Sequence, residues 1–228
     1  GEKFLLQALG DPEAGVRENA IRMSEDLLKQ TGSGLLADRL IALKNDKSPK
    51  VRFQLLASLG FVNTPAAVAA RKELLFSNLE DNWMQIAALS AVPAGDDSLL
   101  EEVLAGYRKG NPQYASLTER ISNMTGATGD IDRISRLIDR ALASSNAKQE
   151  WRSPVLKGLT QSLRNKEIDR QALAAQRELL LAAALANPDA AIRRSAADLL
   201  RLLRLPEGEN TRQALQASLA AIQNPGLD

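Results

Sequence analysis

Residues 46–60 read DKSPKVRFQLLASLG, and this stretch decides the fold. A polar turn containing Pro49 leads into Val51 and then into three leucines. These leucines follow Val51 by four, five and eight residues, at Leu55, Leu56 and Leu59. That spacing places the apolar side chains on one face of an α-helix. Proline is well tolerated in a first helical turn, because the N–H that it lacks would have no partner there. The stretch therefore predicts a turn followed by a helix with one buried stripe.

The same pattern recurs along the chain. It returns at residues 11–17 and 187–193, and weaker copies centre on Trp83, Leu117 and Trp151. The apolar anchors are therefore at positions 16, 51, 83, 117, 151 and 192, at intervals of 35, 32, 34, 34 and 41 residues. Apolar residues at helical spacing also precede each anchor. Intervals of this length are typical of repeats made of two antiparallel helices, and the longest one predicts an extended helix over residues 168–186.

Composition agrees with an all-helical protein and excludes several kinds of site. Of the 228 residues 44% are hydrophobic but only 4% aromatic, and Ala and Leu favour helices. Lys and Arg number 29 against 28 Asp and Glu, so a dominant basic face of the kind that binds nucleic acid is not expected. The chain has no Cys and no His. This excludes disulfides, thiol nucleophiles and imidazole-based metal sites within it, and we expect no cofactor.

These observations predict an all-α fold: a right-handed α-α superhelix of about six helix pairs plus a C-terminal helix over residues 209–222. Residues 1–228 would form one repeat domain with a soft joint near 124–130, where Gly126 and Gly129 lie close together. The chain opens on Gly1 without an initiator methionine, and we expect it to be a piece of a longer protein. No run of apolar residues is long enough to cross a bilayer.

One polar spacing goes beyond generic helices. An Asp or Asn precedes an Arg by six residues in four pairs: Asp11 and Arg17, Asp46 and Arg52, Asn146 and Arg152, Asn187 and Arg193. This resembles the Asp/Asn–Arg pattern of HEAT repeats, and the resemblance implies a hydrogen-bonded ladder between neighbouring repeats. Met84 and Thr118 occupy the Arg position in the two central repeats. We therefore expect the ladder to be interrupted there.

A narrower resemblance covers about two repeats. Residues 49–60 and 81–90 are similar to the HEAT segment of large bacterial multidomain proteins, in which a sorbosone/glucose-dehydrogenase-like propeller precedes the repeats and a c-type cytochrome domain follows them. The resemblance implies a helical spacer and docking domain in a secreted or periplasmic redox protein that is itself a dehydrogenase. No redox residue of that family can be carried onto any position of this chain.

Candidate interaction residues follow from the repeat pattern. The second helices of the pairs would line an inner surface, with exposed side chains at Glu18, Gln54, Gln85, Arg152 and Arg194. Trp83 and Trp151 occupy equivalent anchor positions. Both are interpreted as core residues in the slot of Val51, although tryptophan is also common at interaction hot spots.

Several charged clusters have an ordinary structural interpretation. Arginines gather over residues 193–204 and 133–140, and Asp198, Asp132 and Asp139 offset them. Such runs are usually solvated helix faces, and binding of an acidic partner is the alternative. The pairs Asp96-Asp97 and Glu101-Glu102 fit a helix start, where acidic groups are favourable.

The sequence thus favours a non-catalytic interaction or scaffold module that binds a protein partner or neighbouring domains of its own chain. The alternatives are an enzyme or small-ligand carrier with a pocket on the concave face, and a protein that binds anionic polymers. The domain itself is not expected to be an enzyme, since no nucleotide-binding or nucleophile motif is present.

Overall fold

The computed structural model describes residues 1–92, 96–143 and 149–204. Its described part is all-α, as predicted, with no strand among those residues. The chain divides into two compact units, and the boundary falls between Leu99 and Leu100. Helix α7 (Ser98–Ala105) begins just before that boundary.

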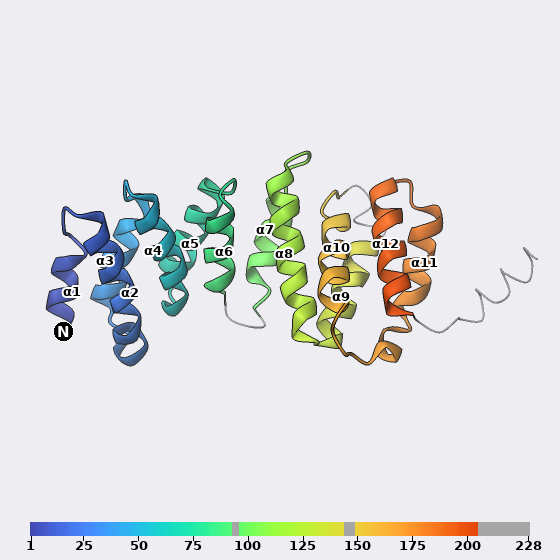
Figure 1. The fold of residues 1–228 in the computed structure, drawn as a ribbon, viewed down its shortest axis with the longest axis horizontal. Coiled ribbons are helices and arrows are strands. Elements are labelled where there is room, and N and C mark those ends of the chain that lie inside the picture. Colours follow the sequence, from blue (N-terminus) through green and yellow to red (C-terminus); the bar gives the residue numbers. More distant parts are fainter. Residues whose placement is uncertain (93–95, 144–148, 205–228) are drawn as a thin grey trace, which may run out of the picture. The chain divides into compact units, whose positions relative to one another are not determined.

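The first unit consists of two layers of helices (Figure 1). Helices α2, α4 and α6 pack in succession in one layer, and α1, α3 and α5 pack in succession in the other. The helices are α1 (Glu2–Ala8), α2 (Ala14–Thr31), α3 (Gly34–Ile41), α4 (Pro49–Ser58), α5 (Pro65–Ser77) and α6 (Asn82–Ser90), with short 3-10 turns η1 (Ala42–Asn45) and η2 (Leu59–Phe61). Contacts of α1 with α2, α2 with α3, α4 with α5 and α5 with α6 join the two layers.

Helix α4 shows why the quoted stretch decides the fold. Its predicted stripe is confirmed, because Val51, Leu55, Leu56 and Leu59 are all fully buried. The helix packs against α2 and α6 on its two sides and against α5 from the other layer. A helix surrounded in this way needs apolar side chains over more than one narrow face.

The second unit repeats the layered arrangement (Figure 1). Helices α8, α10 and α12 pack in succession, α9 packs on α11, and the pairs α9/α10 and α11/α12 are in contact. Their bounds are α8 (Pro112–Thr128), α9 (Ile131–Leu142), α10 (Arg152–Leu163), α11 (Gln176–Ala186) and α12 (Ala190–Leu203), with a 3-10 turn η4 (Arg170–Leu173). The anchors Trp151 and Ile192 are both buried, as predicted.

Helices α8 and α10 approach closely because Gly158 has no side chain. A Cβ atom at Gly158 would lie 2.2 Å from the backbone oxygen of Glu119, a distance that real Cβ atoms do not show. On the other side of α10, the hydroxyl groups of Ser153 and Ser195 form a buried 2.7 Å hydrogen bond to α12. Small residues thus let three helices pack tightly in this unit.

Three local predictions meet different outcomes. The proposed joint at 124–130 is wrong as a loop: residues 124–128 complete α8, and Gly129 ends it in the left-handed conformation. The extended helix over 168–186 is also wrong. Asp169 accepts a hydrogen bond from the Gln171 N–H and starts the short turn η4, so α11 begins only at Gln176. The helix predicted over 209–222 lies outside the described residues.

Candidate functional site

The same polar geometry occurs twice in the first unit, in the turns before α2 and α4, where arginine side chains donate to backbone carbonyl groups. The Arg17 Nη1 donates to the carbonyl oxygens of Asp11 (2.8 Å) and Pro12 (2.9 Å). The Arg52 Nη1 donates in the same way to those of Asp46 and Lys47. In both turns the Asp side chain accepts a backbone N–H two residues later. The carboxylate shapes the turn, and the arginine satisfies the carbonyls that the turn leaves open.

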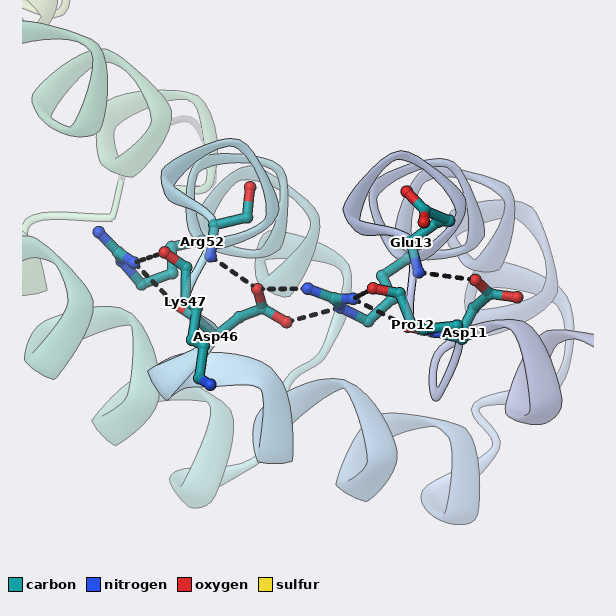
Figure 2. Close-up of polar contacts among 8 residues, drawn as sticks. Asp11, Pro12, Glu13, Asp46, Lys47 and Arg52 are labelled. Atoms are coloured by element: carbon teal, nitrogen blue, oxygen red, sulfur yellow. Dashed lines mark hydrogen bonds and ion pairs between the residues drawn. The ribbon is translucent and has the colours of Figure 1, made fainter.

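One ion pair joins neighbouring turns. The Arg17 Nε and Nη2 donate to the two carboxylate oxygens of Asp46 at 2.7 and 2.8 Å (Figure 2). This is the two-pronged geometry in which guanidinium and carboxylate bind most strongly. The hydrogen bonds from Arg17 lower the pKa of the Asp46 carboxyl below its ordinary value. The structure thus brings together Asp11, Arg17, Asp46 and Arg52 in one connected row.

In the third repeat the structure corrects the predicted alignment by one residue. Met84 and Gln85, and not Trp83 and Met84, take the positions of the apolar anchor and the arginine. The Gln85 Nε2 donates to the carbonyl oxygen of Leu79, six residues earlier, which is the bond that Arg17 and Arg52 make in their own turns. Helix α6 begins at Asn82, so Met84 takes the anchor position and is buried. We expected the ladder to be interrupted at Met84. This is wrong for the hydrogen bond to the turn carbonyl, because Gln85 makes that bond in place of an arginine. Leu79 has no carboxylate, and Arg52 makes no ion pair among the described residues of the kind that Arg17 makes with Asp46.

Among the described residues of the second unit, the turn before α12 repeats the arrangement seen before α2 and α4. The Arg193 Nη1 donates to the carbonyl oxygens of Asn187 (2.7 Å) and Pro188 (3.0 Å). The Asn187 side chain accepts the N–H of Asp189. As in the first unit, the arginine binds the backbone carbonyl of its paired residue: Arg193 contacts the Asn187 carbonyl oxygen and not the Asn187 side chain.

The repeats at Trp151 and Leu117 differ from the turn before α12. Asn146 lies outside the described residues, and Arg152 is buried and donates its Nε to the carbonyl of Ala141 in α9. Burial lowers the pKa of the Arg152 guanidinium. Thr118 is also buried, and its hydroxyl donates to the Tyr114 carbonyl within α8.

The predicted partner surface is only partly exposed. Arg194 is exposed on α12, and Glu18 and Gln54 are half-buried. The expectation is wrong for Gln85 and Arg152, which are 1% and 3% exposed because both point inward to satisfy carbonyl groups. Gln54 contributes to the packing of α4 on α2, since its Nε2 donates to Glu25.

The two tryptophans have opposite environments. Trp151 is 3% exposed, as expected for a core residue, whereas Trp83 is 67% exposed. The interpretation of Trp83 as core is wrong for the same reason as the register: Asp81 caps α6 by accepting the N–H of Trp83, and Met84 faces inward. Ile86, one turn along α6, is 41% exposed. The first unit therefore presents an aromatic and an aliphatic side chain on one face of α6.

Of the pair Asp96-Asp97, Asp96 has the expected structural role at a helix start. Asp96 accepts the backbone N–H of Ser98 at the start of α7. Within residues 1–92, 96–143 and 149–204, no group of three or more Asp and Glu side chains is arranged to hold a metal ion. No helix in that part of the chain is both long and apolar enough to cross a membrane.

Comparison with known proteins adds no assignment. No protein-family model matches the sequence, and neither does any curated protein. The resemblance to HEAT repeats stays a prediction from the sequence.

Proposed function

We propose that this chain is a HEAT-type helical repeat module that binds a protein through the exposed face of α6. The observation that carries the proposal is the exposure of Trp83, a side chain that globular proteins mostly bury. Exposed apolar groups that are grouped, and not scattered singly, mark interaction surfaces. Trp is also among the residues that dominate binding energy at protein interfaces.

The helix layers support this role. Successive packing of α2, α4 and α6 places the second helices of the first unit side by side, and the Arg17–Asp46 ion pair links two of the turns that precede them. A layer fixed in this way is a rigid platform for exposed side chains. Rigid presentation reduces the entropy lost on binding.

The wider setting belongs to the same proposal. A helical spacer and docking domain in a larger secreted redox protein would use such a face to hold either a separate protein or a neighbouring domain of its own chain. The resemblance of residues 49–60 and 81–90 supports this setting. The coding sequence on either side of this segment tests it: a propeller or a haem-attachment motif is expected there, and unrelated flanking domains would contradict it.

Site-specific photo-crosslinking tests the interaction face directly. A benzophenone amino acid placed at position 83 is expected to capture one protein, or one segment of the parent chain, identified by mass spectrometry. The matched control carries the same group at Ala69, which is exposed on α5 in the other layer. Equal capture from both positions, or none from position 83, would refute the proposed face.

A further inference from the structure

The second unit contains a cavity of about 590 Å³ whose lining is dominated by arginine. The lining residues place it between the C-terminal ends of α10 and α12 and the turn η4. Arg164, Arg170, Arg201 and Arg204 line it together with Thr160 and Asp198. The sequence groups Arg201 and Arg204 with Arg193 and Arg194 on one helix. That group does not include Arg164, which ends α10, or Arg170, which lies in η4.

The charge of this cavity is strongly unbalanced. Four guanidinium groups face one carboxylate, that of Asp198, which pairs with Arg201 at 2.7 Å. Arg164, Arg170 and Arg204 make no ion pair with any carboxylate among the described residues. A cation near a helix C-terminus is favourable by itself. That effect accounts for single arginines at the ends of α10 and α12, but it does not bring Arg170 to the same cavity from a different segment.

Backbone conformation gives a second, independent observation. Arg204 ends α12 with φ 47° and ψ 42°, in the left-handed region. Among the described residues it is the only non-glycine with positive φ, and the other helices that end in this conformation do so at Gly32 and Gly129. Glycine adopts this conformation without steric cost. Keeping a large side chain at a strained position is a pattern found where the side chain has a task.

We infer that this cavity is a binding site for a small ligand that carries two or more phosphate groups. Guanidinium groups match phosphate oxygens with paired hydrogen bonds, and several phosphates are needed to engage groups from three segments. The volume is within the range of small-ligand sites, and the polar lining disfavours an apolar ligand. A polymer is disfavoured because the excess charge is confined to one cavity in a chain of net charge +1.

Calorimetric titration with sodium pyrophosphate at low ionic strength tests the site. Arg204→Gly is the decisive variant, because glycine fits the left-handed cap. We expect the unliganded melting temperature to stay the same or rise, while pyrophosphate affinity falls about tenfold or more, as for one lost charge-assisted contact. Arg194→Gln is the matched control, since it removes one charge from the same helix outside the cavity. Its affinity should remain within about twofold of wild type.

Two further arms make the result decisive. Asp198→Asn removes the one carboxylate and should tighten pyrophosphate binding. A single-stranded oligonucleotide, compared at equal phosphate concentration, should bind more weakly than pyrophosphate. The inference is overturned if wild type shows no pyrophosphate binding, if Arg204→Gly and Arg194→Gln weaken it equally, or if the oligonucleotide binds more tightly.

Discussion

The two tryptophans form a natural pair for a stability experiment, because each unit contains one and their burial differs sharply. Trp151 in the second unit is 3% exposed and Trp83 in the first is 67% exposed. Truncation of a buried tryptophan to alanine costs about 3–5 kcal/mol, since apolar contacts are lost and a cavity remains. The Arg140 guanidinium also lies 5.6 Å from the centre of the Trp151 ring, and that cation–π contact would be lost too.

Trp151→Ala should therefore lower the free energy of unfolding by about 3–5 kcal/mol. Trp83→Ala should change it by no more than about 0.5 kcal/mol, as surface substitutions generally do. Urea unfolding followed by circular dichroism measures both values. In the first variant the remaining tryptophan is Trp83, so its fluorescence reports the first unit while the second is destabilised.

Fluorescence quenching provides the control for these assignments. In the folded Trp83→Ala variant only Trp151 emits, and acrylamide should quench it poorly. In the Trp151→Ala variant the exposed Trp83 should be quenched readily. Equal destabilisation by the two substitutions, or equal quenching of the two rings, would refute the one-residue register shift in α6 and the interaction face built on it.

Three further substitutions test single contacts, all by denaturant unfolding. Gly158→Ala forces a methyl group against the Glu119 carbonyl and should cost about 1–3 kcal/mol; a neutral result would show that α8 and α10 can separate freely. Gln85→Leu leaves the Leu79 carbonyl without its donor and should cost about 1–3 kcal/mol, whereas no loss would mean that water replaces the amide. Asp46→Asn tests pH dependence: the folded-state pKa is lowered, so the stability from this group is complete above the unfolded value of 3.8 and is lost as pH falls through the folded value. The variant should therefore lose less stability than wild type on acidification below about pH 4, and parallel pH profiles would contradict the ion pair.

Sequence alone was sufficient for the helical class and for most of the buried stripes. Val51, Leu55, Leu56 and Leu59 lie at offsets of 4, 5 and 8, which a helix places on one side and a strand does not, and Pro49 marks where that helix begins. These are local properties, since helical periodicity and turn chemistry act over a few residues. The spacing of Asp46 and Arg52 likewise identified a turn and the side chain that satisfies it.

Tertiary structure decided which side chains are buried or exposed and which distant residues meet, because both depend on the neighbours of each helix. Trp83 and Val51 follow similar turns, but the start of α6 at Asn82 rotates Trp83 outward and turns Gln85 into a buried donor. A shift of one residue turns a side chain by about 100° around the helix, which the sequence could not resolve without the capping geometry. The arginine cavity has the same origin. Arg170 and Arg204 are far apart in the chain, and only the packing of α10, η4 and α12 brings them to one site.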